Sequence, residues 1–115
     1  MNHAEALRDL LEPALPDYQW QFGRWEDNAA PARYAVLRPA GGVGAGLLRQ
    51  PQFTLSLVGL RAGDALNLAE ACDFVIETCR AEAGALVYVE AGEPVFVPTA
   101  DGRPIFEIAL SVIAT

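Results

Sequence analysis

Few residue types in this chain can perform catalysis. The single histidine, His3, stands close to the start of the sequence, and no second histidine can join it in a metal site. The two serines, Ser56 and Ser111, both fall inside segments predicted to be strands, and no GxSxG pattern marks either as a nucleophile. All 8 basic residues are arginines, so Schiff-base chemistry through lysine is excluded. We therefore expect no catalytic centre, no metal ion and no cofactor.

The residues from 41 to 46, GGVGAG, are the part of the sequence most similar to a phosphate-binding loop. A dinucleotide-binding fingerprint requires G-x-G-x-x-G between a strand and a helix, but Leu47 occupies the third glycine position and a strand is predicted to follow. Without a helix N-terminus, the segment lacks the backbone donors that hold phosphate groups. We interpret residues 40–50 as a long glycine-rich hairpin loop that a partner orders on binding. Its candidate interface residues are Gly42, Gly44, Gly46, Leu47, Leu48 and Arg49.

Charged residues offer two alternative sites. Glu70, Asp73 and Glu77 fall on the outer face of a predicted helix, where acidic side chains are usually solvated rather than engaged in acid–base catalysis. A set of arginines brackets the predicted hairpin, and together they could hold an anion in a small ligand-binding domain or enzyme. This second alternative stays open beside an assembly role. Its arginines are Arg33, Arg38, Arg49 and Arg61.

One strand and the helix that follows it must position these residues. Residues 52–60, QFTLSLVGL, alternate in polarity, which predicts a strand with one face in the core. Asp64 can then cap a helix, and apolar residues recur from Ala65 onwards at a spacing that predicts a core-facing stripe. Phe74 lies opposite this stripe, so either the first helix or another subunit must cover it. The stripe consists of Ala65, Leu68, Ala69, Cys72, Val75, Ile76 and Cys79, with both cysteines interpreted as buried apolar residues.

The remaining segments supply a first helix and the other strands. The helix is predicted over residues 2–12, because Pro13 ends it. The strand at 52–60 is expected to run antiparallel to the strand before it. The chain is therefore expected to be one α+β domain over residues 1–115, with a mainly antiparallel sheet packed by one long central helix and a short N-terminal helix. The other strands are predicted at 18–22, 33–38, 85–91, 93–98 and 104–115.

Composition narrows the choice of partners. The formal net charge of −7 and the pI near 4.5 would repel a phosphate backbone, so we expect no specific nucleic-acid binding. Apolar residues make up 52% of the sequence, yet no run of them approaches the ~18 residues of a membrane span. Acidic residues near the start argue against a secretory signal peptide. The apolar excess favours a subunit that buries surface against partners.

Two segments and the order of the predicted elements resemble a known family. Residues 33–42, RYAVLRPAGG, and 50–60, QPQFTLSLVGL, are similar to segments of tail terminator (tail completion) proteins of long-tailed bacteriophages, including the lambda-like minor tail U group. The resemblance covers most of the chain and implies a structural virion protein rather than an enzyme. It implies a hexameric ring that caps the tail tube, ends tail polymerisation and joins the tail to the head. Another neck, head–tail connector or tube subunit is the alternative.

The resemblance also implies partners and a location. The partners would be other copies of the chain, the tail tube protein and a connector or neck protein, in a virion assembled in the bacterial host cytoplasm. DNA would pass through the ring, and an acidic lining would keep it from adhering. A closed ring needs one patch of each copy to meet a different patch of the next. Phe74, the loop at 40–50 and the aromatic strand at 18–22 are the candidate patches.

Overall fold

The computed structural model describes residues 3–23, 32–45, 48–60, 62–81, 88–97 and 103–113. Their helices are α1 (His3–Leu11) and α2 (Ala65–Ala81), with short 3₁₀ turns η1 (Glu12–Ala14) and η2 (Ala62–Asp64). Their strands are β1 (Tyr18–Phe22), β2 (Arg33–Ala45), β3 (Leu48–Val58), β4 (Tyr88–Ala91), β5 (Val95–Val97) and β6 (Ile105–Ile113).

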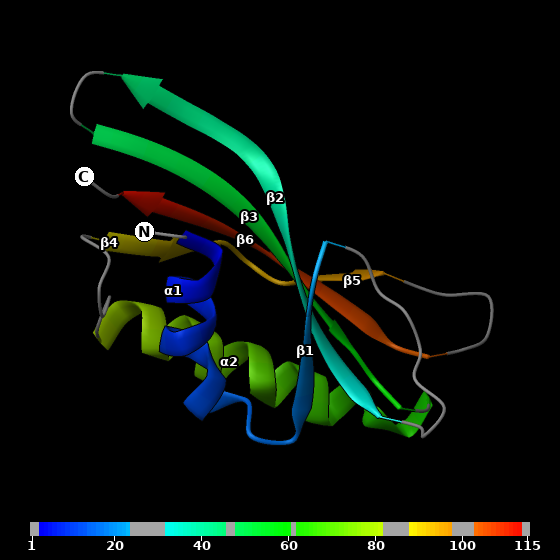
Figure 1. Cartoon of the computed structure of the whole chain (residues 1–115). Coiled ribbons are helices and arrows are strands. Elements are labelled where there is room, and N and C mark those ends of the chain that lie inside the picture. The colour runs from blue at the N-terminus through cyan, green and yellow to red at the C-terminus, as the bar shows by residue number, and fades with distance from the viewer. Residues whose placement is uncertain are drawn as a thin grey trace.

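These elements form two layers. Both helices lie on the same face of one strongly twisted sheet, and α1 packs against α2 (Figure 1). The expected α+β class is confirmed. The expectation of one long central helix is corrected, because α1 and α2 share the covering of this face. α1 covers part of the sheet through Leu7 and Leu11. These two residues are four positions apart, so they lie on the same side of the helix, and both are buried.

The described strands form one six-stranded sheet in the order β1–β2–β3–β6–β4, and β5 pairs with the other end of β6. Every pair is antiparallel except β1–β2, which is parallel. The expected antiparallel pairing of β3 with the strand before it is therefore confirmed. The last described strand, β6, lies inside the sheet, with β3 on one side and β4 and β5 on the other.

The main core lies between the helices and the face of the sheet that they cover. The predicted alternation of β3 is confirmed, because Phe53, Leu55 and Leu57 all lie in this core. Fully burying a side chain of this size contributes roughly 1.5–3 kcal/mol, so the interlayer contacts hold the helices on the sheet. A smaller cluster on the opposite face contains Tyr34, Val36 and Val58. The core residues of the other elements include Leu7, Leu11, Leu15, Leu68, Val75, Cys72, Cys79, Val89, Ile108, Leu110 and Val112.

The predicted stripe of α2 is confirmed at its centre and shifted at its margin. Leu68, Cys72, Val75 and Cys79 are buried as expected. Ala71, which the stripe left out, is also buried, while three members of the stripe are only partly buried. The helix is therefore rotated slightly toward Ala71. The partly buried members are Ala65, Ala69 and Ile76.

The glycine-rich segment is not the long loop predicted for residues 40–50. β2 continues to Ala45 and β3 begins at Leu48, and the two strands pair from Gly42↔Pro51 to Ala45↔Leu48. The register shifts between Pro39 and Gly42, and Gly41 adopts φ +88°, a conformation that glycine takes readily. The prediction was wrong because glycine has a low strand propensity. In the structure, hydrogen bonding of the backbone to β3 holds this segment in a strand although its side chains are small.

Candidate functional site

Phe74 on α2 remains in contact with solvent in the folded chain. Its side chain is 53% exposed, so α1 leaves more than half of it uncovered. Of the two alternatives for covering Phe74, the first helix is therefore insufficient. Burial by another subunit stays a prediction.

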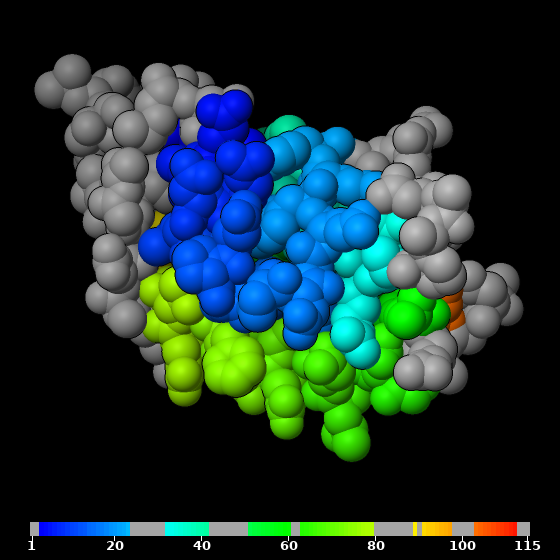
Figure 2. All heavy atoms as spheres, turned by 60° about the horizontal axis from the view of Figure 1, so that its bottom comes forward, coloured from blue at the N-terminus to red at the C-terminus, as the bar shows by residue number. Residues whose placement is uncertain are grey.

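Phe74 lines an open hollow of about 490 Å³ between α2 and the turn that follows α1. Figure 2 shows this helix-bearing face, where the blue residues of α1 and η1 lie directly against the yellow-green residues of α2. Pro13 and Pro16 shape the turn, because proline cannot continue the helix. The hollow is mostly apolar and suits an apolar side chain of a partner. Its lining consists of Leu10, Pro13, Ala14, Pro16, Phe74, Glu77 and Thr78.

Strand β5 exposes two apolar side chains that were not predicted as interface residues. Val95 is 59% exposed and Phe96 is 53% exposed. The Phe96 ring lies 5.5 Å from the ring of Phe106, in a tilted arrangement, so one side of Phe96 packs and the other faces solvent. The sequence signal was present, since the residues EPVFVP place apolar side chains on both faces of a very short strand.

The remaining candidate interface residues lie along the ribbon formed by the far ends of β2 and β3. Gly42 and Gly44 belong to β2, while Leu48 and Arg49 belong to β3, with Gly44 paired to Arg49. Gly46 and Leu47 lie outside the described residues. The ribbon projects away from α2 (Figure 1). Of the described candidates, the structure therefore brings Gly42, Gly44, Leu48 and Arg49 together in this ribbon, whereas Phe74 lies on α2.

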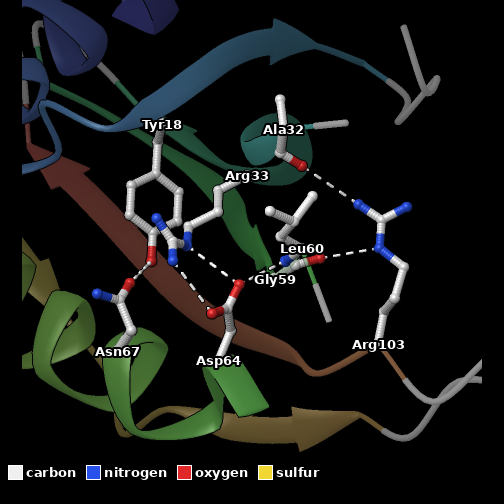
Figure 3. Close-up of polar contacts among 8 residues, drawn as sticks. All are labelled: Tyr18, Ala32, Arg33, Gly59, Leu60, Asp64, Asn67 and Arg103. Carbon is white, nitrogen blue, oxygen red and sulfur yellow. Dashed lines mark hydrogen bonds and ion pairs between the residues drawn. The ribbon is translucent and has the colours of Figure 1, made fainter. Parts of the chain in front are cut away.

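Arg33 is held by an ion pair rather than left available for an anion. Its Nε and Nη2 donate to the two carboxylate oxygens of Asp64, each at 3.1 Å (Figure 3). The hydrogen bonds to Asp64 raise the pKa of Arg33 above its usual value. Asp64 also accepts a hydrogen bond of 2.7 Å from the backbone N–H of Leu60. The carboxylate predicted to cap α2 thus joins the start of β2 to the end of β3.

Tyr18 ties β1 to the first turns of α2. Its hydroxyl donates to Oδ1 of Asn67 at 2.9 Å (Figure 3). Burial raises the pKa of Tyr18 to about 12, because the phenolate would lose its hydration. Tyr18 is therefore neutral over the physiological pH range and serves as a hydrogen-bond donor.

The uncovered face of the sheet carries a second polar group of residues. Nη2 of Arg38 lies 2.9 Å from Oε2 of Glu107, and the hydroxyl of Ser56 donates to the same oxygen at 3.0 Å. Both Arg33 and Arg38 are thus paired with carboxylates. Arg61 lies outside the described residues, as does the side chain of Arg49. The described residues therefore give no support to an anion site built from these arginines.

The two cysteines are free and buried against the sheet, as predicted. Burial raises the pKa of Cys72 to about 12 and that of Cys79 to about 11. Both side chains are therefore protonated at neutral pH. They act as small apolar residues of the core.

The described ranges hold no candidate for two other kinds of site. No group of three His, Cys, Asp or Glu residues described by the structure lies close enough to hold a metal ion. No helix in the same part of the chain is long and apolar enough to cross a membrane.

Comparison with known proteins agrees with the predicted resemblance. A search of curated proteins found no match. The family described as phage tail termination protein matches residues 1–115, which is the whole sequence. The chain therefore belongs to the family of phage tail termination proteins, which are structural proteins of the virion tail with a role in tail completion.

Proposed function

We propose that copies of this chain assemble into a hexameric ring that caps the tail tube, ends tail polymerisation and forms the joint to the head and neck. The observation that carries this proposal is the match of the tail termination family to all of residues 1–115. The partners are other copies of the chain, the tail tube protein and a head–tail connector or neck protein. Assembly takes place in the cytoplasm of the bacterial host.

Exposed apolar side chains support an assembly role. Phe74, Val95 and Phe96 are each more than half exposed. They lie on two separate elements, α2 and β5, so the chain offers apolar contacts on more than one surface. A closed ring requires such different patches, because each copy meets the next through two unlike surfaces.

The net charge of −7 is consistent with a ring through which DNA passes. An acidic lining repels the phosphate backbone, so the DNA slides without adhering. The acidic residues Glu70, Asp73 and Glu77 are exposed on α2. They supply a charged surface whichever side of the ring α2 occupies.

A tube-growth experiment tests the proposal directly. Purified tail tube subunits are allowed to polymerise with and without the folded protein, and tube lengths are measured in negative-stain images. We expect shorter tubes with a ring at one end when the protein is present. Tubes of unchanged length and bare ends at a saturating concentration of the protein would contradict the proposal.

Replacing Phe74 tests whether the hollow on the helix face is a contact surface. Phe74→Ser should leave the monomer folded, because the side chain is half exposed, but it should lower the fraction of capped tubes at least tenfold. Leu66→Ser is the matched control, since it removes an exposed apolar side chain from the same helix outside the residues that line the hollow. Equal capping by wild type and Phe74→Ser would remove this hollow from the interface.

A further inference from the structure

One edge of the sheet changes partner halfway along β2. β1 pairs with β2 only from Arg33 to Leu37, and Gly23 adds a hydrogen bond of 2.9 Å from its N–H to the carbonyl oxygen of Leu37. Beyond that point β2 continues to Ala45 with β3 as its only strand partner among the described residues. The backbone groups on the outer side of residues 39–45 therefore form an edge that another strand can pair with.

The opposite edge of the sheet is formed by β4 at the same end of the molecule (Figure 1). β4 pairs with β6 from Tyr88↔Ile113 to Ala91↔Leu110 and has no second strand partner in the described ranges. The N–H of Gly92 donates to the carbonyl oxygen of Ala109 at 2.8 Å, which shows that Ala109 directs its backbone groups toward β4. Because these directions alternate along a strand, the backbone groups of Val89 and Ala91 point outward.

The two free edges lie on the same rows of the sheet. Pro39 pairs with Phe53, Phe53 pairs with Leu110, and Leu110 pairs with Ala91. From this row toward the ribbon, β2 extends from Pro39 to Ala45. In the same direction, β4 extends from Ala91 to Tyr88. The free part of β2 and the outer side of β4 are thus level with each other across the sheet.

The directions of the strands make these two edges complementary. β2, β3, β6 and β4 are successively antiparallel, so β2 and β4 run in opposite directions. A rotation about an axis parallel to the strands preserves each direction. It therefore sets β4 of one copy antiparallel to β2 of the next, at the same height.

The sequence of the free edge favours close approach of another backbone. Glycine in a strand often marks such an approach, and Gly41, Gly42 and Gly44 all lie in this part of β2. Edges that must stay unpaired usually carry charged residues, whereas residues 39–45, PAGGVGA, contain none. Pro39 lacks an N–H, so pairing is expected to begin beyond it.

We propose that β4 of one copy pairs antiparallel with residues 40–45 of β2 in the next copy, so that the sheets of neighbouring copies join edge to edge. This inference deepens the proposed function, since it rests on the copies forming a ring. The contact is heterologous, because β4 meets β2 and not a second β4. An open chain of copies therefore keeps one unpaired β2 edge and one unpaired β4 edge at its two ends. Only a closed ring pairs both edges of every copy.

Two proline variants can block the two edges separately. The extra residue at the register shift turns the backbone groups of Gly44 outward, and those of Ala91 already point outward. Gly44→Pro and Ala91→Pro therefore remove an outward N–H without removing a hydrogen bond inside the sheet. Glu93→Pro is the control, because Glu93 is exposed and lies between β4 and β5. Circular dichroism and thermal melting establish that each variant is folded.

Native mass spectrometry then measures assembly at the highest soluble concentration. Wild type and Glu93→Pro should assemble beyond the dimer, while Gly44→Pro alone and Ala91→Pro alone should remain monomers. An equimolar mixture of Gly44→Pro and Ala91→Pro should form a heterodimer and nothing larger, since one intact edge of each kind remains. Wild type that stays monomeric, a folded single variant that assembles normally, or a mixture without the heterodimer would overturn the inference.

The tube-growth experiment separates this inference from the proposed function. Edge variants that cap tubes as well as wild type would reject the pairing of β4 with β2 and leave the terminator role intact. A wild-type chain that assembles in the edge-dependent way but does not stop tube growth would reject the terminator role and leave the edge pairing intact.

Discussion

At the scale of single residues, the carboxylate of Asp64 joins the start of β2 to the turn that leads from β3 into α2. It binds Arg33 at the start of β2 and the N–H of Leu60 after β3, and it stands directly before α2. The sequence predicted Asp64 only as a local helix cap and Arg33 only as a candidate anion ligand. An ion pair between residues 31 positions apart leaves no periodic signal, because its partners are set by the packing of the elements.

We expect Asp64→Asn to lower the free energy of unfolding by about 2 kcal/mol, because hydrogen bonds to charged groups contribute roughly 1.5–3 kcal/mol. Urea denaturation at neutral pH measures this difference. Asp73→Asn is the control, since Asp73 is exposed on α2, and surface changes usually stay within about 0.5 kcal/mol. Equal stabilities of the two variants would show that the contacts of Asp64 contribute nothing measurable.

At the scale of elements, apolar periodicity predicted α1, α2 and the alternation of β3, since each buries one face. It did not predict the parallel pairing of β1 with β2, because alternation in a strand specifies which side chains are buried and not which strand lies beside it. It also failed for residues 40–45, whose small side chains carry no alternation. There the register shift at Pro39–Gly42 and the positive φ of Gly41 set the course of the ribbon.

Gly41→Ala should destabilise the protein by about 1–2 kcal/mol, because a side chain at φ +88° brings Cβ close to the backbone. Thermal melting of the variant measures the effect. Gly63→Ala is a matched control, since its added Cβ meets open space and its φ is not in the left-handed range. That variant should be neutral or slightly more stable. A Gly41→Ala variant that melts at the wild-type temperature would show that the register shift does not depend on glycine.

At the scale of the whole molecule, the surfaces that we propose for contact between copies could be predicted only in part from the sequence. Phe74 stood out because it breaks the amphipathic pattern of α2, and it is indeed half exposed. The free edges of β2 and β4 could not be predicted, because they exist only once the strand order is known. Of the titratable groups that burial shifts, Cys72 and Cys79 were predicted to be core residues, whereas Tyr18 was predicted within a candidate contact strand and instead packs partly against the core. Together they give the fold a pH dependence.

Stability should fall as the pH rises above about 9. Burial raises the pKa of Cys72 from 9.0 to about 12, of Cys79 from 9.0 to about 11 and of Tyr18 from 10.0 to about 12. The unfolded chain releases these protons first, so the folded state binds more protons between pH 9 and 11, and stability is lost as the pH rises. Urea midpoints measured from pH 7 to 11 should be level up to about pH 9 and decrease beyond it.

A variant with both Cys72→Ala and Cys79→Ala separates the contributions to this pH dependence. Its stability should hold to about pH 10, where only the tyrosine remains to titrate, although its stability at neutral pH is lower because of the lost volume. If the double variant and the wild type lost stability over the same pH range, the thiols would not be the groups responsible.

The position of β6 has a consequence for synthesis of the protein. β3, β4 and β5 all pair with this strand, so none of them can complete its sheet before residues 105–113 have left the ribosome. Translation delivers the chain from its N-terminus, so the edges of β3, β4 and β5 that pair with β6 stay unpaired in a nascent copy until β6 emerges. A prematurely released fragment lacks the strand that joins the two halves of the sheet. Only copies translated through β6 can therefore complete the sheet.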